Sequence, residues 1–278
     1  MRGAYNPPMR VTRRHALGAL AAGGAAVAAA GGYSLLVEPR RLGVTRVTVP
    51  LAGLPDALAG LRLGLVTDLH YGAFAGDDLL ASVVEALTAD APDLVLLGGD
   101  FVTNSDRAAV TPCAEALGRL TARHGVFAAL GNHDPEPQVK SAFERRGVAV
   151  LRDEHTRIAV RGEPVSVGGL RYWSRRLADL QKTFRGSRGF PILLAHDPRR
   201  LDLAAAAALP LVLSGHTHGG QIVLPGLGAP AAARYPVVHG LGRRGPSTVF
   251  VSRGVGTVVL PVRFNCPPEV VILTLARA

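Results

Sequence analysis

The chain has 278 residues, of which 48% are hydrophobic, so it is long enough to bury one large core or two small ones. The formal net charge is +10, yet only 5% of the residues are aromatic and the arginines are scattered along the chain. A nucleic-acid surface usually combines a clustered basic stripe with aromatic residues that stack on bases. The composition therefore argues against a nucleic-acid partner.

The first 37 residues are typical of an export signal. Residues 1–15 contain no acidic residue and four arginines, at positions 2, 10, 13 and 14, and 22 uncharged residues, mostly Ala and Gly, follow at 16–37. A basic start with the letters TRR at 12–14, followed by a weakly apolar stretch of membrane-spanning length, predicts a twin-arginine signal. We expect residues 1–37 to be cleaved after export or retained as an anchor, with the rest of the chain outside the cytoplasm.

Residues 44–278 read as one catalytic domain in which strands and helices alternate. Apolar runs begin the segments LRLGLV (61–66), DLVLLGGD (93–100), GVFAALGNHD (125–134), FPILLAHDP (190–198) and LPLVLSGHTH (209–218), and each run predicts a strand. Between them, apolar residues at helical spacing over 79–87 predict a helix with Asp77 as its N-cap, and an alanine-rich helix is expected after 198. This alternation predicts an α/β domain, to which the closing strands over 247–275 add a second sheet.

Histidines and short polar side chains recur where these apolar runs end. The residues in these positions are His70, His133, His196, His216, His218, Asp68, Asp100, Asn132, Asp134 and Asp197. Loops at the carboxyl ends of strands converge on one crevice, so we expect these side chains to meet. Imidazole and carboxylate ligands without thiolate suit Mn, Fe or Zn, and the ligands are too numerous for one ion with an open position. The sequence therefore predicts a pair of divalent ions.

The segments DLH, GGD, GNHD, AHD and GHTH, in this order, resemble the calcineurin-like metallophosphoesterase superfamily. Nearly the whole chain resembles its bacterial, twin-arginine-exported branch of YkuE-like and YaeI-like phosphoesterases. The resemblance implies a four-layer αββα sandwich of two mixed β-sheets flanked by helices, the metallo-dependent phosphatase fold. It also implies hydrolysis of a phosphodiester, phosphomonoester or pyrophosphate at the cell envelope.

The resemblance also assigns the metal ligands residue by residue. It implies that one ion is held by Asp68, His70 and His218, that a second is held by Asn132, His196 and His216, and that Asp100 bridges the two. A pair of ions in this arrangement lowers the pKa of a bridging water, so that hydroxide attacks phosphorus without a protein nucleophile. Glycines beside Asp100, Asn132 and His216 let the backbone turn tightly there.

Other residues near these segments receive weaker assignments. The resemblance implies that His133, held by Asp134, lies over the phosphate and protonates the leaving group. Asp197 stands where many relatives have Asn, and we interpret it as the cap of the next helix. Two arginines, Arg253 and Arg263, either contact the substrate phosphate or are structural.

Several other features of the sequence do not indicate a catalytic or binding role. We interpret Tyr172 and Trp173 as core or rim aromatics, and Cys113 and Cys266 as unpaired, partly buried thiols. The letters GLGRRG at 240–245 match a dinucleotide-binding loop, but the element after them predicts a strand and not the helix that such a loop requires.

Three functional alternatives remain beside the general phosphoesterase. The chain could be a lipid-precursor hydrolase like UDP-2,3-diacylglucosamine pyrophosphatase, with a lipid-linked substrate. The charge of +10 keeps a nuclease of the same superfamily open. A metal-binding module without catalysis is the third alternative, although the complete ligand set argues against it. The sequence does not indicate the oligomeric state or the identity of the metal.

Overall fold

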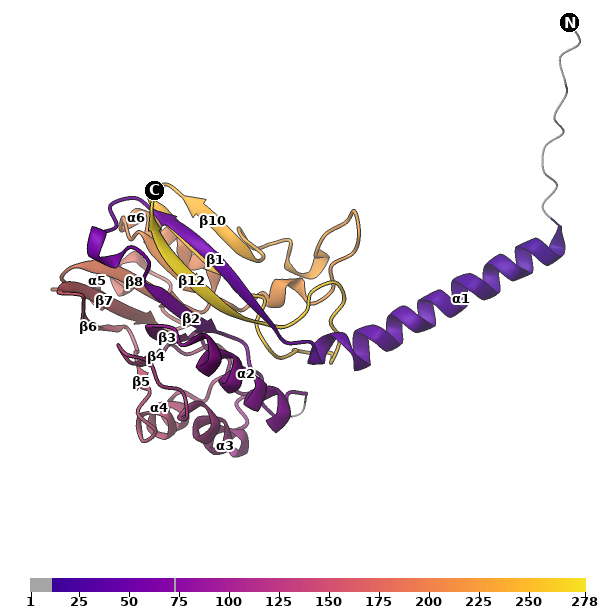
Figure 1. The fold of residues 1–278 in the computed structure, drawn as a ribbon, viewed down its shortest axis with the longest axis horizontal. Coiled ribbons are helices and arrows are strands. Elements are labelled where there is room, and N and C mark those ends of the chain that lie inside the picture. Colours follow the sequence, from indigo (N-terminus) through magenta and orange to yellow (C-terminus); the bar gives the residue numbers. More distant parts are fainter. Residues whose placement is uncertain (1–11, 73) are drawn as a thin grey trace, which may run out of the picture.

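Two mixed β-sheets of six strands each form the centre of the structure, a computed structural model that describes residues 12–72 and 74–278 (Figure 1). The first sheet has the strand order β1 (Gly43–Leu51), β12 (Glu269–Arg277), β2 (Arg62–Val66), β3 (Leu94–Leu97), β4 (Val126–Ala128) and β5 (Ala149–Val150). The second has the order β10 (Gly240–Arg244), β11 (Ser247–Val251), β9 (Leu211–Ser214), β8 (Phe190–Ala195), β7 (Glu163–Leu170) and β6 (Glu154–Val160). Strands β2 to β5 are parallel, and so are β7, β8, β9 and β11.

Helices cover the outer faces of both sheets and complete the four predicted layers. Helices α2 (Asp77–Asp90), α3 (Arg107–Leu117) and α4 (Glu136–Glu144) lie on the first sheet, and α5 (Leu177–Thr183) and α6 (Leu201–Ala206) lie on the second. A hydrophobic core lies between the sheets, where leucines and valines of both inner faces pack together. Strands such as LVLL of β3 are apolar throughout because both of their faces are buried. The αββα fold class is thereby confirmed.

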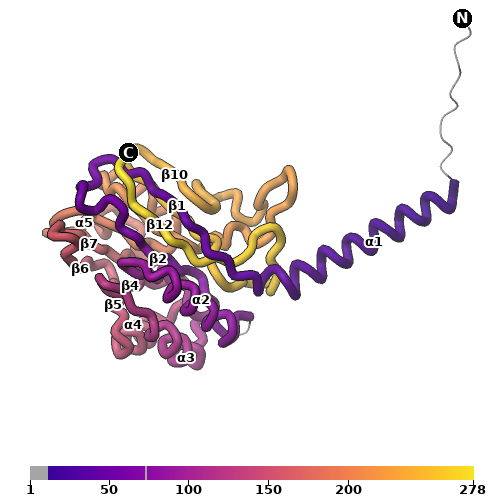
Figure 2. The backbone as a smooth tube through the Cα atoms, viewed as in Figure 1, coloured from indigo at the N-terminus to yellow at the C-terminus, as the bar shows by residue number. Residues whose placement is uncertain are grey.

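Two details of the predicted elements differ from the structure. Asp77 is the first residue of α2, and Gly76 occupies the N-cap, so the predicted cap is displaced by one position. The closing strands do not all join one new sheet. Strand β11 pairs with β9 of the second sheet and β10 extends its edge, whereas β12 inserts between β1 and β2 of the first. Figure 2 shows β12 running beside β1, with which it pairs in parallel over nine residues.

Short 3₁₀ helices connect several elements. They are η1 (Glu38–Arg40), η2 (Asp56–Leu58), η3 (Pro198–Arg200), η4 (His218–Gly220) and η5 (Pro230–Ala232). The GLGRRG segment at 240–245, whose letters match a dinucleotide-binding loop, includes strand β10 and opens no helix, as expected. Cys113 and Cys266 are both free, as predicted, but both are fully buried and not partly buried.

Helix α1 (Arg13–Leu36) extends away from the two sheets and is exposed along most of its length (Figure 1). The Thr12 side chain caps it by accepting a hydrogen bond from the His15 backbone N–H. Within the described part of the chain, the stretch Arg13–Arg40 is the one helical stretch long and apolar enough to cross a membrane. Residues 1–11, with Arg2 and Arg10 of the predicted signal, lie outside the described residues.

Candidate metal centre

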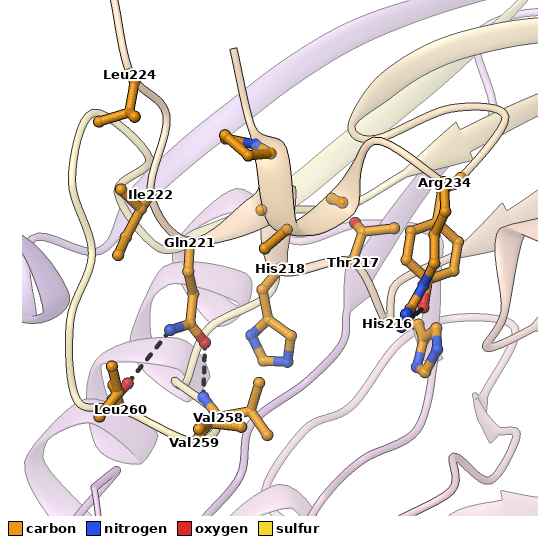
Figure 3. Close-up of a pocket in the computed structure, with 15 residues that line it drawn as sticks. His216, Thr217, His218, Gln221, Ile222, Leu224, Arg234, Val258, Val259 and Leu260 are labelled. Carbon is orange, nitrogen blue, oxygen red and sulfur yellow. Dashed lines mark hydrogen bonds between the residues drawn. The ribbon is translucent and has the colours of Figure 1, made fainter. Parts of the chain in front are cut away.

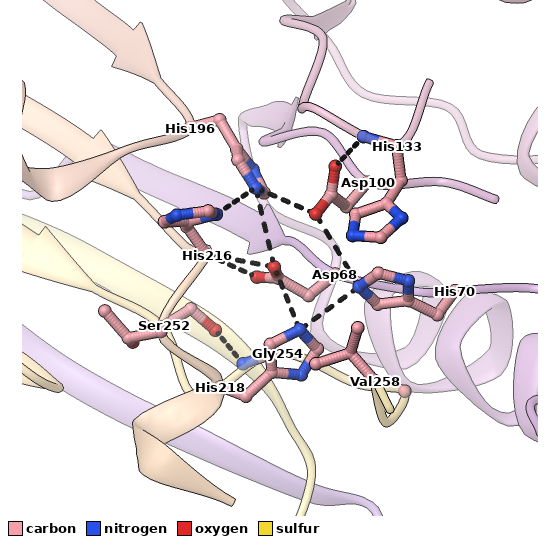
Figure 4. A network of polar contacts seen from close by, with 12 residues as sticks. Asp68, His70, Asp100, His133, His196, His216, His218, Ser252, Gly254 and Val258 are labelled. Carbon is pink, nitrogen blue, oxygen red and sulfur yellow. Dashed lines mark hydrogen bonds and ion pairs between the residues drawn. The ribbon is translucent and has the colours of Figure 1, made fainter. Parts of the chain in front are cut away.

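Six of the seven side chains predicted to bind metal meet at the carboxyl ends of strands from both sheets, namely Asp68, His70, Asp100, His196, His216 and His218 (Figure 4). In the first sheet, Asp68 and His70 follow β2, Asp100 follows β3 and Asn132 follows β4. In the second sheet, His196 follows β8, and His216 and His218 follow β9. Because the sheets pack face to face, loops that are up to 150 residues apart in sequence (68–218) enclose one polar centre.

The first ligand group consists of Asp68, His70 and His218, all buried, with one donor atom of each within 4.8 Å of the others. The Nε2 atoms of His70 and His218 are 3.1 Å apart, and His218 Nε2 is 3.4 Å from Asp68 Oδ1. The backbone N–H of His216 donates to both Asp68 carboxylate oxygens, at 2.9 and 3.0 Å. This last contact fixes the distance between the Asp68 loop and the loop after β9.

The second group consists of Asp100, His196 and His216, also within 4.8 Å by their donor atoms. His196 Nε2 is 3.0 Å from Asp100 Oδ2 and 3.2 Å from His216 Nδ1. Asp100 Oδ2 is in addition 3.6 Å from His70 Nε2 of the first group. The Asp100 carboxylate therefore lies between the two groups, which is the position a bridging ligand requires.

The backbone at these positions is held in a strained conformation. Five of the predicted ligands have positive φ angles, namely Asp68 (53°), His70 (47°), Asp100 (54°), His216 (72°) and His218 (52°). Non-glycine residues rarely occupy this region, and such residues concentrate at functional sites where surrounding contacts enforce the conformation. The short loops thus turn the side chains inward at a conformational cost of about 1–3 kcal/mol each.

Two glycines allow the carboxylates to approach neighbouring backbone. A Cβ atom at Gly215 would lie 2.2 Å from Asp68 Oδ2, and one at Gly131 would lie 2.0 Å from Asp100 Oδ1. Both contacts are shorter than any real Cβ contact, so a side chain at either position displaces a carboxylate. The predicted need for glycine beside the ligands thus has a steric basis at these two positions.

Burial and charge set the protonation of the imidazoles. Burial lowers the pKa of His70 and of His216 to about 4, and it lowers the pKa of His218 well below its ordinary value. These three rings are therefore neutral at pH 7 and keep a lone pair for a metal. Burial by itself lowers the pKa of His196, but the carboxylates of Asp100 and Asp68 raise it to about 10, so this ring carries a second proton at pH 7. A cation that binds His196 Nε2 would displace that proton. His196 Nδ1 donates to the Gly98 carbonyl at 2.8 Å, which directs Nε2 to the centre.

The donor set fits a pair of divalent cations. Asn132 Oδ1 and His218 Nδ1 are buried, and neither atom has a hydrogen-bond partner among the described residues. A buried carbonyl oxygen without a partner is costly. Asn132 lies between Gly131 and His133, both of which contact Asp100, and a cation bound beside Asp100 would satisfy the Asn132 oxygen. Mixed imidazole and oxygen ligands are those that Mn, Fe and Zn prefer. The chain thus has suitable donors for both ions.

Asp134 does not hold His133, contrary to the expectation. Its two buried oxygens accept hydrogen bonds from the backbone N–H groups of Gly131 (2.8 Å), Asp100 (2.9 Å) and Phe101 (2.8 Å). Asp134 therefore joins the loops after β3 and β4, and it touches the site through the backbone of Asp100. The reason is geometric, because the Asp134 carboxylate is held by these backbone N–H groups while the His133 ring packs against His70.

The His133 ring is instead fixed by a residue that the sequence did not indicate. His133 Nδ1 accepts a hydrogen bond of 3.0 Å from the Asn104 backbone N–H, which leaves the ring proton on Nε2. The ring packs edge-on against His70, with 4.9 Å between centroids, and its backbone N–H donates to Asp100 Oδ1 at 2.9 Å. A half-buried imidazole thus stands beside the first ligand group and presents an N–H donor.

The two arginines considered for substrate binding both contact protein groups, but to different extents. Arg263 is fully buried, and its guanidinium donates to the backbone carbonyls of Gly256, Cys266 and Gly254 among others. Arg253 forms an ion pair of 2.6 Å with Glu269. The expectation of substrate contact is therefore corrected for Arg263, because its donors are occupied by backbone carbonyls. For Arg253 it stays a prediction, because Nη2 is the only atom of its guanidinium that bonds to described residues, Glu269 and Thr45.

Asp197 caps η3, as interpreted from the sequence, and pairs with an arginine. Its carboxylate accepts from the Arg199 backbone N–H at 2.9 Å and from the Arg199 guanidinium at 2.7 Å. The ring of Tyr172 lies 5.3 Å from that of His216, and Tyr235 approaches the same ring at 5.4 Å. Tyr172 is thus a rim aromatic of the centre, while Tyr235 and Asn104 carry no local sequence signal that would have indicated them.

Comparisons with known proteins agree with this arrangement. The family model described as calcineurin-like phosphoesterase matches residues 61–220. The chain is 30% identical to the uncharacterised metallophosphoesterase YkuE of Bacillus subtilis (93% of this chain, 94% of the relative) and 31% identical to phosphodiesterase YaeI of Escherichia coli (95% and 99%). A transmembrane protein with metallophosphoesterase domain from Danio rerio is 32% identical over 88% of this chain, which spans 60% of that relative. The solved structure of Haemophilus influenzae NAD nucleotidase has a similar fold (TM-score 0.52, 14% identity, 70% of this chain and 50% of that one).

Proposed function

The chain belongs to the calcineurin-like phosphoesterase family and is a phosphoric ester hydrolase, and on that premise we propose that it cleaves phosphodiesters at the cell envelope. The observation that carries the proposal is the position of Asp100. Its Oδ2 atom lies 3.0 Å from His196 Nε2 in one ligand group and 3.6 Å from His70 Nε2 in the other. One carboxylate between two imidazole groups is the arrangement in which two cations share a ligand.

The proposed ligands form two groups, one for each cation. Asp68, His70 and His218 would hold one cation, Asn132, His196 and His216 would hold the other, and Asp100 would bridge them. A bound pair of cations supplies a water nucleophile of lowered pKa and neutralises charge on the phosphoryl oxygens. Neutral imidazoles at His70, His216 and His218 suit this role, because a protonated ring has no lone pair to offer. We infer Mn, Fe or Zn from the ligand types.

His133 would act on the leaving group. With Nδ1 bonded to the Asn104 N–H, the proton at Nε2 is the one that can be donated to the departing oxygen. Asp100 accepts a hydrogen bond from the His133 backbone N–H. The carboxylate that would bridge the two cations therefore also positions the proposed proton donor, His133. YaeI, which matches almost the whole chain, is named a phosphodiesterase, and this supports the choice of a diester substrate.

The experiment that tests the proposal measures metal content and turnover together. Full-length protein is reconstituted separately with Mn, Fe and Zn and assayed on bis(p-nitrophenyl) phosphate. We expect two ions per chain, and hydrolysis that disappears when a chelator removes them and returns when the ions are restored. Two bound ions without turnover of any phosphoester would contradict the proposal and indicate a binding module.

The position at the cell envelope is inferred from α1. This helix is apolar and exposed and begins with Arg13 and Arg14, as a twin-arginine signal or anchor would. The Danio rerio relative is named a transmembrane protein, which supports membrane attachment. Cell fractionation is expected to recover the chain in the membrane or the exported fraction, and recovery in the cytosol alone would contradict this part of the proposal.

A further inference from the structure

A largely apolar cavity adjoins the metal centre and takes no part in the chemistry described above. Its volume is about 550 Å³, within the range of roughly 300–1,000 Å³ of small-molecule sites. His216 and His218, which belong to the two ligand groups, form part of its wall (Figure 3). The rest of the wall is mainly aliphatic and includes Ile222, Leu224, Ala232, Val258, Val259 and Leu260. A ligand that fills this cavity would therefore reach the metal centre with one end.

The cavity is built by two loops that hydrogen bonds hold together. The side-chain amide of Gln221 donates to the carbonyls of Leu260 (3.2 Å) and Val262 (3.1 Å) and accepts from the Val258 N–H at 2.7 Å (Figure 3). The Val223 N–H donates to the Phe264 carbonyl at 2.9 Å. These contacts fix the loop after β9 against the loop after β11, so the apolar space between them is part of the fold.

The rim of the cavity exposes large aliphatic side chains on the side where α1 leaves the domain. Val259 is 83% exposed and Leu260 56%, and exposed apolar patches mark contact with an apolar partner. The Arg263 N–H donates to the Ser34 carbonyl at 3.0 Å, which ties the loop that carries Val259 to the last turns of α1 (Figure 1). A membrane that holds α1 would therefore lie next to the rim.

We propose that the cavity binds a hydrocarbon chain of an amphiphilic membrane phosphoester whose phosphate lies at the metal centre. This inference rests on the proposed function and names its substrate class. Arg234 lines the cavity near His216 and is exposed, and no described carboxylate forms an ion pair with it, so its charge can face an anionic head group. The aliphatic wall, the exposed rim and the adjacent apolar helix all match a lipid taken from the membrane.

The test measures how activity depends on chain length. Full-length metal-loaded protein in lipid nanodiscs is assayed on p-nitrophenyl alkyl phosphodiesters from methyl to octyl. We expect kcat/KM to rise by about two- to fourfold per added methylene. The upper value corresponds to the ~0.8 kcal/mol that complete burial of one methylene contributes. The Leu224→Asp variant, which puts a charge at a wall residue that is 37% exposed, should reduce the rise to less than about twofold over the series.

A matched control and three outcomes make the test decisive. Leu241→Asp makes the same change at a residue of β10 that is 43% exposed and outside the cavity wall, and it should retain the wild-type dependence. Hydrolysis that is independent of chain length would overturn the lipid proposal and leave the phosphodiesterase standing. An unchanged rise in Leu224→Asp would overturn it as well, because the chain would then bind elsewhere. Absence of hydrolysis for every ester would overturn the proposed function itself.

Discussion

Replacing Asp100 with Asn is expected to lower kcat/KM for phosphodiesters by about 10³-fold, equivalent to ~4 kcal/mol of lost transition-state stabilisation. The substitution keeps the shape of the side chain and removes its charge. Because Asp100 Oδ2 lies within 3.6 Å of imidazole nitrogens from both ligand groups, the loss affects both cations. We expect metal analysis to show fewer than two ions per chain together with the loss of activity.

Asp202→Asn is the control for this experiment. It makes the same chemical change at an exposed carboxylate of α6 that pairs with Arg244 and belongs to neither ligand group. It should bind two ions and hydrolyse substrate at the wild-type rate. An Asp100→Asn protein that is folded, holds two ions and keeps full activity would show that no charged bridge is needed, and the two-ion assignment would be wrong.

The His133→Asn variant is expected to bind metal normally and to lose about 10²–10⁴-fold in kcat on esters with poor leaving groups. The reason is that His133 lies outside both ligand groups, while its Nε2 proton is held in place by the bond from the Asn104 N–H to Nδ1. The loss should be small for p-nitrophenyl esters, whose leaving group departs without a proton. The measurement is kcat for a series of diesters that differ in the pKa of the leaving alcohol.

His124→Asn is the matched control for this series, since His124 precedes β4 and so lies at the opposite end of that strand from the site. It should show the wild-type dependence on the leaving group. If His133→Asn reduces activity equally for good and poor leaving groups, the ring positions substrate or metal and donates no proton. If it loses metal as well, its role is structural.

The sequence pattern predicted an α/β domain and the strand ends at which the polar side chains gather, and the family resemblance implied the four-layer sandwich. The reason is local, because a buried parallel strand must be apolar throughout and must end in a turn, and the short polar side chains after each turn share one edge of a sheet. His216 and His218 illustrate this: their position after an apolar run placed them at the strand end, and their spacing of two matched the assignment to two different ligand groups. The resemblance to a known family supplied the pairing of ligands.

Only the tertiary structure decided what the neighbouring residues do. Asp134 is adjacent to His133 in sequence, yet its carboxylate accepts backbone N–H groups from the loops after β3 and β4, while Asn104 holds the His133 ring. The carbonyls that surround the Arg263 guanidinium all come from residues 253–266, but only the folded path of that segment shows that they turn toward it. The apolar cavity arises where the segments around Ile222 and Val258 meet, 36 residues apart. A local pattern shows at which strand end a residue lies. The contacts of its side chain depend on other segments, and only packing brings those segments together.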